Sequence, residues 1–458
     1  MKNSSLEFTE GSLCKNIFVF SIPLMFSNLL QALFNMSDLA VVGHFAGPLS
    51  LGAVGSTTQL VMFITGILIG LASGINVIAA FYIGAKKEKD LAETVHTGAE
   101  ICLIAGTAML VLGFCFAEKI LVLMGTKPEL IEGATLYLRI YMLGMPAVAL
   151  YNFGNSILSA AGDTRRPLIF LTAAGILNIA LNLFFVIVFR MDVAGVAFAS
   201  IISQYLSAAL ILRSLTHEKN GTRLRLRTLK INRHKAAKIL KVGLPAGIQN
   251  AIFAFANIFI QVGVNSFDAV MVAGNSAAAN ADPLVYDVMA AFYMGCAGFI
   301  GQNYGAAKPG RVAKTYFVAL GYSFIFGLVL GLGIHAAGRP FLAIFTSDPA
   351  VIEAGLQRIS IMSLSYCVSA FMDNTIAASR GLGKTFVPSI IVILGSCVFR
   401  IIWIYTVFAW FKTIHSLYLL YVFSWGITAL AEIIYFVRIF RKAAAEMKKH
   451  GIQEAITE

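Results

Sequence analysis

Polar side chains form a stripe along the first long apolar segment of the sequence. Asn28, Gln31, Asn35 and Asp38 follow one another at intervals of three, four and three residues, so on a helix they share one face. An ionised carboxylate among apolar residues in a bilayer costs several kcal/mol unless it is paired, hydrated or protonated. Asp38 is therefore the first candidate for binding a proton or a small cation. The alternative is that Asp38 lies at the outer interface and merely meets water.

Two further apolar segments carry groups that could complete a site with Asp38. Asn178 and Asn182 are one helical turn apart, and Ser200 and Gln204 have the same spacing. Their oxygens could build a cage for a small hard cation, or hold the carboxylate ready to accept a proton. The competing interpretation is polar packing between helices, which is common for Asn and Ser in membranes. The predicted cation-coupling residues are Asp38, Asn178, Asn182, Ser200 and Asn35.

Charged residues also lie inside later apolar segments. Arg400 is the deepest by sequence, and its charge requires a partner. A structural ion pair with Asp373 or Asp287 is one interpretation, and a role in binding substrate or protons is the other. Glu432 is expected near the cytoplasmic face, solvated or paired. The predicted lining of a substrate cavity consists of Gln31, Phe34, Asn152, Asn155, Gln249, Asn257, Tyr293, Asp373 and Arg400.

The sequence contains no motif of an enzyme. A Walker A loop, an HExxH motif and a clustered Ser/His/Asp set are all absent from the sequence. We therefore expect a protein that is not an enzyme and has no cofactor. Transport by such a chain would draw on an ion gradient, with Na⁺ or H⁺ as the coupling ion.

The composition indicates that these residues are positioned by membrane-spanning helices. Of the 458 residues, 58% are hydrophobic and only 13% are charged, which is far more apolar than a soluble domain. Apolar runs of roughly 20 residues recur, each long enough to cross a bilayer as a helix. The predicted fold class is all-α and polytopic, with about twelve spans. Their expected bounds are near 17–43, 51–82, 94–124, 133–160, 167–189, 193–213, 239–267, 277–304, 314–345, 353–379, 386–410 and 413–438.

The basic residues predict the orientation of these spans. The net charge is +12, but the Lys and Arg residues gather in alternate loops, which points to the positive-inside rule and not to nucleic acid. Both termini are then cytoplasmic, and the segment from Thr216 to Lys238 is a basic cytoplasmic linker. We expect a multi-pass protein of the cell membrane, a monomer whose partners are the lipid bilayer and small organic substrates.

An internal repeat divides the chain into two homologous halves. Pro23 matches Pro245, and Asn28 and Asn35 match Asn250 and Asn257 at the same offset; Asp38 then matches Ile260. Six crossings return the chain to its starting side, so the halves have the same orientation, as in transporters with parallel repeats. The predicted division is an N-terminal six-helix lobe over 1–213, the linker over 214–238 and a C-terminal six-helix lobe over 239–458.

The motifs, taken in order, resemble those of the multidrug and toxic compound extrusion (MATE) family of secondary transporters. The resemblance covers essentially the whole chain. It rests on FNMSDLAVVGHF, LGAVG, AAGDTRRP, GILNIALN, LPAGIQN, GQNYGA and SRGLGKT.

The resemblance implies export of organic cations and other amphipathic compounds in exchange for Na⁺ or H⁺. In the prokaryotic subgroup that this chain resembles, the first-span acid of an N-lobe cation site maps onto Asp38, and the fifth-span motif onto Asn178 and, at its acidic position, Asn182. With Na⁺, the ligands would be Asp38, Asn178 and Asn182. The asparagine at 182 leaves this cage with less negative charge, so the choice of ion stays open. An alternative function is that of a lipid-linked oligosaccharide flippase of the same broader superfamily, although only Arg400 is placed to hold a pyrophosphate.

Overall fold

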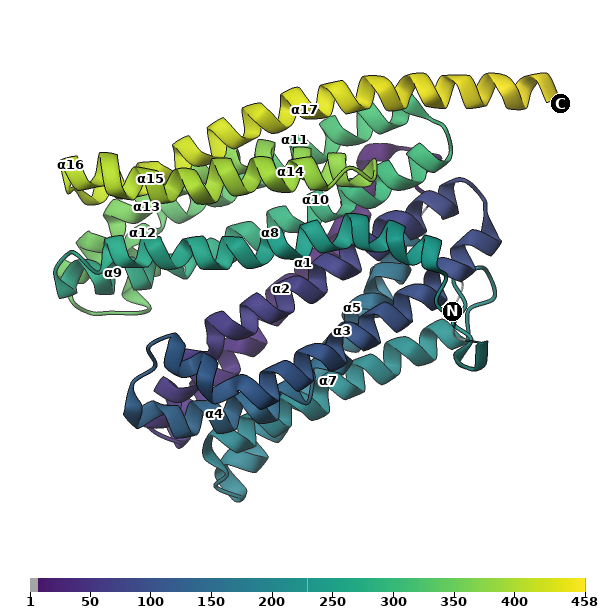
Figure 1. Ribbon diagram of the computed structural model, residues 1–458. Helices are drawn as coiled ribbons and strands as arrows, with labels where there is room; N and C mark the ends of the chain where they lie inside the picture. Colours follow the sequence, from purple (N-terminus) through teal and green to yellow (C-terminus); the bar gives the residue numbers. More distant parts are fainter. Residues whose placement is uncertain (1–6, 229, 458) are drawn as a thin grey trace. The chain divides into compact units, whose positions relative to one another are not determined.

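The chain is almost entirely helical in the computed structural model, which describes residues 7–228 and 230–457 (Figure 1). No β-strand occurs among these residues. Long apolar runs favour helices because a helix satisfies its own backbone hydrogen bonds where water is absent. The helices are α1 (Leu13–Phe45), α2 (Pro48–Gly84), α3 (Glu88–Leu123), α4 (Pro128–Met142), α5 (Met145–Ala160), α6 (Arg165–Leu183), η1 (Phe184–Val188), α7 (Asp192–Thr216), η2 (Leu226–Thr228), α8 (Arg233–Val264), α9 (Ala269–Ala279), α10 (Ala281–Gly305), α11 (Pro309–Ala336), α12 (Gly338–Ala343), α13 (Pro349–Gly381), α14 (Phe386–Val392), η3 (Ile393–Val398), α15 (Phe399–Trp403), η4 (Ile404–Phe408), α16 (Ala409–Phe411) and α17 (Ile414–Thr457).

The lengths and compositions of the helices confirm a polytopic membrane protein. In the described part of the chain, nine helical segments are long and apolar enough to cross a bilayer, and α4 with α5, bent by 47°, makes a tenth if counted as one span. Helices α8 and α13 have 32 and 33 residues; α13 contains the tenth predicted span, and α8 covers the seventh except for its last three residues. The polar composition of α13 fits its place in the fold, where it packs against α9, α10, α11 and α17.

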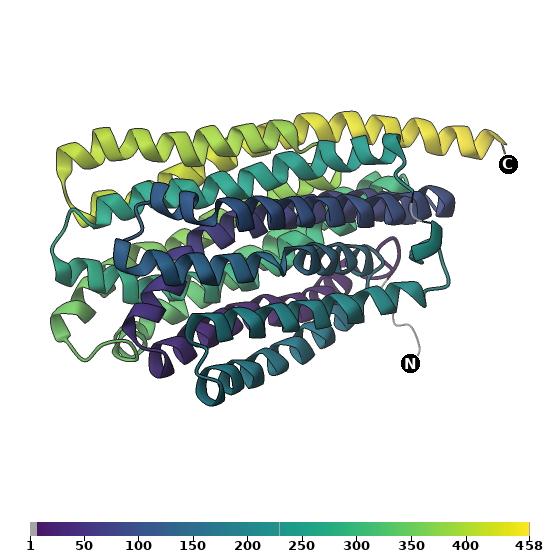
Figure 2. The same cartoon turned by 60° about the horizontal axis from the view of Figure 1, so that its bottom comes forward.

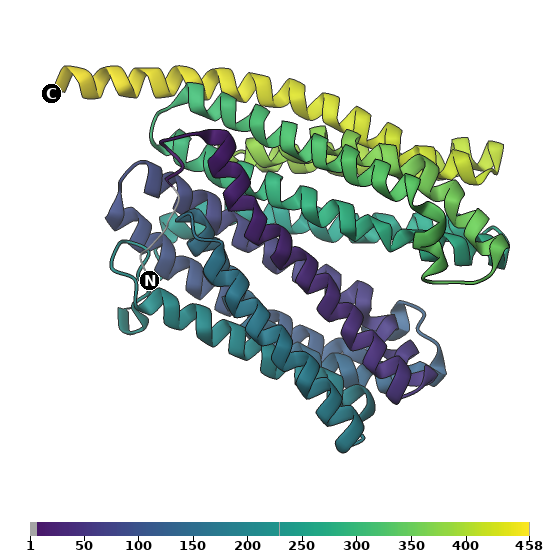
Figure 3. The same cartoon turned by 180° about the vertical axis from the view of Figure 1, so that it is seen from behind.

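The helices group into two compact units. The first unit is Phe26–Ala251, and the second unit combines Glu7–Met25 with the chain from Ile252 onward. The dividing points lie inside α1 and α8, shortly after Pro23 and Pro245. Each of these two helices therefore begins in one unit and ends in the other. In Figure 3, α1 is the continuous purple helix.

The first unit is a bundle of the second part of α1, α2 to α7 and the first part of α8. Its core is built from apolar side chains of all these helices, and Leu68, Ile75, Leu138 and Phe153 are at most 1% exposed. These helices are drawn from blue to teal in Figure 2. This apolar core holds the helices of the first unit together.

Glycines bring the first part of α8 into backbone contact with α2. A Cβ atom on Gly70 would lie 2.2 Å from the Cα of Gly247, and one on Gly74 would lie 2.6 Å from the backbone nitrogen of Gly243. Only residues without a side chain permit this approach. Gly70 and Gly74 therefore serve close packing of α2 against α8.

The segment before α8 is fastened to the same unit. Lys235 is 3% exposed, forms an ion pair with Asp90 and donates to the hydroxyl of Tyr82 at 2.9 Å. Asn232 donates to Glu93 at 2.9 Å and its Oδ1 accepts from the backbone nitrogen of Lys235. The end of the predicted linker is therefore a docked structural element.

The second unit contains α9 to α17, the second part of α8 and the beginning of the chain. Phe8 stacks on Phe299 with ring centroids 3.7 Å apart, and its carbonyl accepts from Asn303 at 3.0 Å and from Arg311 at 3.0 Å. The Ser21 hydroxyl donates to the carbonyl of Ala291 at 3.3 Å. These contacts hold the segment before α1 against α10 and α11, and the first part of α1 against α10.

Candidate functional site

Two helices of the first unit, α6 and α7, bring polar groups to Asp38 on α1. The carboxylate on α1 accepts one hydrogen bond from Asn182 Nδ2 on α6 at 2.5 Å and another from Ser200 Oγ on α7 at 3.1 Å. Asn182 Nδ2 also donates to Asn178 Oδ1 at 3.2 Å, and Asn178 Nδ2 donates to Ser200 Oγ at 3.4 Å. The four residues therefore form one closed hydrogen-bonded cluster.

Three of the four residues in this cluster are buried, and Asp38 is partly exposed. Asn178 and Ser200 are 6% and 5% exposed, and Asn182 is fully buried. Oδ1 of Asn182 accepts no hydrogen bond from any group in the described chain, so one buried carbonyl oxygen is left without a donor. Together with Asp38, Asn178 Oδ1 and Ser200 Oγ, it makes an oxygen set that fits a small hard cation.

A glycine allows α1 to approach α6 beside the cluster. Gly175, Asn178 and Asn182 are spaced to share a face of α6. A Cβ atom on Gly175 would lie 1.7 Å from Cζ of Phe34. The ring of Phe34 thus occupies the space that a side chain at 175 would fill, one turn before Asp38.

Several residues predicted for the first unit lie outside the cluster. Asn35 and Gln31 are exposed on α1. Asn152 donates to the carbonyl of Val148 in its own helix at 2.9 Å, and Asn155 accepts from Ser159 at 3.3 Å. Gln249 is 5% exposed on the first part of α8.

The remaining predicted residues lie in the second unit, where Arg400 is the central one. It is 2% exposed. Its Nε donates to Ser424 at 3.3 Å and its Nη1 to Asn257 Oδ1 at 3.4 Å. The guanidinium carbon lies 4.8 Å from the ring centroid of Tyr421. Within the described residues Arg400 makes no ion pair, so the expected structural pair with Asp373 or Asp287 is not formed.

Two acids share this unit with Arg400. Asp373 has a buried carboxylate oxygen without a hydrogen-bond donor and acts on Arg400 only through longer-range electrostatics. Tyr293 is partly buried and lies within electrostatic range of Asp373. Glu432 is fully buried, which excludes the solvated alternative and leaves Arg380 as the cation acting on it.

The sequence reasoning missed a buried ionic network in the same unit. Arg358 donates to Asp282 at 2.5 Å and to Asn275 Oδ1 at 3.1 Å. Tyr366 donates to Asp282 at 2.6 Å, and Tyr418 to Asn275 at 2.8 Å. Asp282 and Arg358 lie inside predicted spans, so the rule that intramembrane charges need partners could have found them. The network joins α9, α10, α13 and α17.

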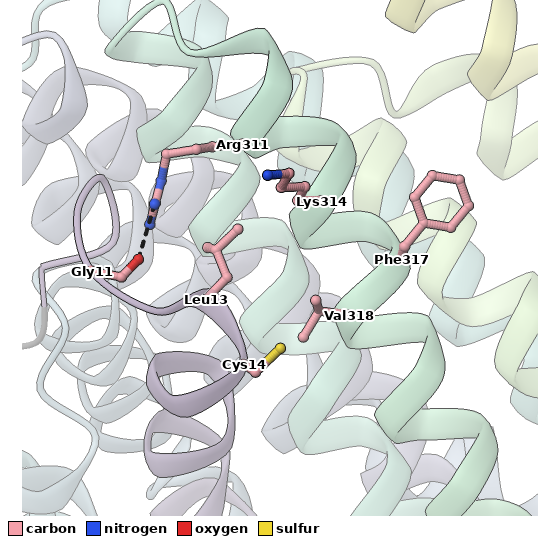
Figure 4. A pocket seen from close by; sticks show the side chains of 7 residues that line it. All are labelled: Gly11, Leu13, Cys14, Arg311, Lys314, Phe317 and Val318. Atoms are coloured by element: carbon pink, nitrogen blue, oxygen red, sulfur yellow. Dashed lines mark hydrogen bonds between the residues drawn. The ribbon is translucent and has the colours of Figure 1, made fainter.

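A cavity of about 370 Å³ lies beside the start of α1, and Figure 4 shows its lining side chains. None of the predicted site residues lines it. Arg311 points across it and donates to the carbonyl of Gly11 at 3.0 Å. The guanidinium is therefore engaged in holding the chain's beginning, and the cavity is separate from the Asp38 and Arg400 sites.

Two homologous helical units, each with buried polar groups inside apolar spans, define a polytopic membrane transport protein. The sequence model of the MatE family matches residues 23–184 and again residues 245–406. The chain therefore belongs to the MatE family. The double match confirms the internal repeat and begins at the paired residues Pro23 and Pro245.

Known relatives have similar sequences over most of the chain. A probable multidrug resistance protein of Bacillus subtilis, YpnP, is 29% identical over 79% of this chain and 80% of its own length. A probable multidrug resistance protein of Thermotoga maritima, NorM, is 26% identical over 83% and 82%. The solved structure of a MOP superfamily transporter from Pyrococcus furiosus has a TM-score of 0.89 at 22% identity, covering 97% of this chain and 99% of that one.

Proposed function

We propose that the protein is a cation-coupled antiporter that exports organic cations and other drug-like amphipathic compounds by alternating access, with Na⁺ or H⁺ as the coupling ion. The observation that carries this proposal is the closed cluster around Asp38, in which a carboxylate inside an apolar span is held by groups from two other helices. The names of the relatives, probable multidrug resistance proteins, support the substrate class.

The geometry supplies a way for a cation to move α1. A proton or Na⁺ that binds Asp38 offsets the negative charge of the carboxylate, and this weakens the charge-assisted hydrogen bonds that Asn182 Nδ2 and Ser200 Oγ donate to it. Rotating the Asn182 amide would turn its unpartnered oxygen toward the cation. Either change loosens the hydrogen bonds that fasten α1 to α6 and α7.

Movement of α1 has a route to the second unit. The helix is continuous from Leu13 to Phe45, and its first part belongs to the second unit through Phe8, Ser21 and their partners. A displacement at Asp38 would therefore be passed along the continuous helix α1 toward its first part. Pro23 lies within this helix, and its missing N–H group makes bending there easier.

The placement in the cell is part of the same proposal. Basic residues in alternate loops favour a cell membrane protein with cytoplasmic termini. The chain would act as a monomer, since each of its two units is complete within one chain.

The test is efflux of a fluorescent organic cation from proteoliposomes under an imposed Na⁺ gradient and, separately, an imposed pH gradient. One gradient should drive efflux, and Asp38→Asn should abolish it while the protein stays folded. Glu118→Gln is the matched control, because the side chain of Glu118 in α3 is 60% exposed. Normal efflux by Asp38→Asn would refute the proposal. Absence of transport under both gradients would favour the flippase alternative.

A further inference from the structure

The cavity beside the start of α1 has no part in the proposed coupling mechanism. It measures about 370 Å³ and lies between the beginning of the chain and α11, within the second unit. The α1 side contributes Leu13, and the α11 side contributes Arg311, Lys314 and Val318 (Figure 4). None of the described residues that line it is acidic. The charge of the cavity is therefore positive.

Arg311 is a fixed positive charge on this wall. Its Nη1 donates to the carbonyl of Gly11 at 3.0 Å, and its Nη2 donates to the carbonyls of Phe8 and Glu10, both at 3.0 Å. Its Nε donates to Asn303 Oδ1 at 3.1 Å. All four acceptors are neutral oxygens, so these bonds orient the guanidinium without offsetting its charge. One hydrogen of Nη1 is left for a further acceptor, because a guanidinium carries five N–H donors.

Lys314 adds a second positive charge one helical turn away on α11. It is exposed, and within the described residues its ammonium has no hydrogen bond or ion pair. Figure 4 shows the ammonium on the side where Arg311 and Leu13 lie. Like charges three or four residues apart on a helix repel each other. An anion placed between Arg311 and Lys314 would therefore be favourable.

The other walls of the cavity are apolar and continue along α11. Val318 is partly buried, and Leu13 is 8% exposed. Phe317, Ile325 and Val329 are 67%, 53% and 60% exposed on a helix long and apolar enough to span a bilayer. Exposed apolar side chains on such a helix meet the hydrocarbon chains of lipids. The cavity thus joins a positively charged pocket to a lipid-contacting surface.

We propose that this cavity binds the phosphate headgroup of an anionic phospholipid. Lys314 and the remaining Nη1 hydrogen of Arg311 donate to the phosphate oxygens, and an acyl chain lies against Phe317 and Val318. A choline headgroup carries its own positive charge, which two cations without a neighbouring acid repel, whereas a glycerol headgroup carries none. The site therefore selects phosphatidylglycerol over phosphatidylcholine.

The inference goes beyond the export function and does not depend on the coupling ion. With the beginning of the chain on the cytoplasmic side, as proposed above, the headgroup belongs to the inner leaflet, where anionic lipids attract basic groups. The bound lipid contacts both α1 and α11. It therefore adds to the contacts that hold the first part of α1 in the second unit.

The competing interpretation is that Lys314 only extends its ammonium to the membrane surface, as lysines near the ends of spanning helices do. It would then meet whichever headgroup is present, and the shape of the cavity would not matter. The two interpretations differ in whether filling the cavity changes the lipid preference.

The experiment measures lipid binding to the purified full-length protein in detergent by native mass spectrometry. The protein is titrated with phosphatidylglycerol and, separately, with phosphatidylcholine of the same acyl chains. We expect the first phosphatidylglycerol to bind at least about fivefold more tightly, the effect of one basic residue beside an anionic headgroup. Lys314→Gln should remove this preference, and Lys314→Arg should retain it. Lys384→Gln, the matched control at an exposed lysine outside the cavity, should leave it unchanged.

A second variant tests the cavity without changing any charge. Val318→Phe fills the space beside Lys314 and should also bring the two lipids to equal affinity. Free glycerol 1-phosphate, which has the headgroup phosphate but no acyl chain, should not displace bound phosphatidylglycerol. Equal affinity of the unaltered protein for the two lipids, a preference that persists in Lys314→Gln or Val318→Phe, or displacement by glycerol 1-phosphate would overturn the proposal.

Discussion

The two units descend from one repeated sequence, yet the position of Asp38 has opposite surroundings in them. In the first unit Asp38 is held by Asn182 and Ser200. In the second unit the matching residue is Ile260, which is 4% exposed and packs in an apolar cluster with Ile404 and Phe408. The second unit instead carries a positive charge, Arg400, on the segment that corresponds to the helix of Asn178. A shared backbone therefore supports an acid site in one unit and a basic site in the other.

The units also differ in how they receive a helix segment from the other half of the chain. The first unit holds the beginning of α8 by direct backbone contact through Gly70 and Gly74. The second unit holds the beginning of the chain mainly by side chains, with Phe8 stacked on Phe299 and Phe20 above Gly295. Backbone contact leaves no room for adjustment, whereas side chains can rearrange.

The largest effect is expected from placing the acid of the first unit in the second. Ile260→Asp buries a carboxylate in a cluster where Tyr418 and Trp403 already donate their hydrogen bonds to other groups, and should lower the free energy of unfolding by about 3–5 kcal/mol. Thermal unfolding of the detergent-solubilised protein measures this. Ile260→Val, the control, should cost about 1 kcal/mol. If Ile260→Asp were as stable as the control, the two units would be interchangeable at this position.

The next effect concerns the glycine contact of the first unit. Gly70→Ala places a Cβ atom 2.2 Å from the Cα of Gly247, and should destabilise the protein by about 3 kcal/mol because neither backbone can yield. Gly55→Ala in the same helix is the control, since nothing lies within 4 Å of its Cβ position. Unfolding curves of the two variants that coincide would contradict the close packing of α2 and α8.

A smaller effect should follow from removing one donor of the Asp38 cluster. Ser200→Ala leaves Asn182 as the remaining hydrogen-bond donor to the carboxylate and removes one candidate cation ligand. The loss is about 1.5 kcal/mol, or roughly tenfold in the apparent affinity for the coupling ion. Efflux measured across a series of ion concentrations should show the shift. Ser203→Ala, whose hydroxyl donates within its own helix to Ala199, should leave the affinity unchanged.

The smallest effect is expected where the second unit holds its exchanged segment. Gly295→Ala brings a Cβ atom 3.2 Å from Cδ1 of Phe20, a contact that a small movement of the ring relieves. The cost should be about 1 kcal/mol, clearly below that of Gly70→Ala in the same unfolding assay. Equal destabilisation by the two variants would remove the distinction between backbone and side-chain contact.

Much of the architecture follows from the sequence because its causes are local or periodic. Apolar runs of bilayer length predict spanning helices, and polar residues three and four apart predict the face that carries Asp38. The repeat of Pro23 and Asn28 at Pro245 and Asn250 predicts two related halves. Each of these signals depends on residues within one segment or on comparing two segments.

The partners of the polar groups were decided by tertiary packing. Spacing places Asn178 and Asn182 on one face of α6, but only the bundle shows that this face meets Asp38 and that Gly175 receives Phe34. Arg400 was expected to pair with an acid and instead meets Ser424, Asn257 and aromatic rings. The sequence by itself shows which residues have a high free energy of burial in a membrane. The contacts that offset this free energy come from helices distant in the chain, so only the tertiary structure decides them.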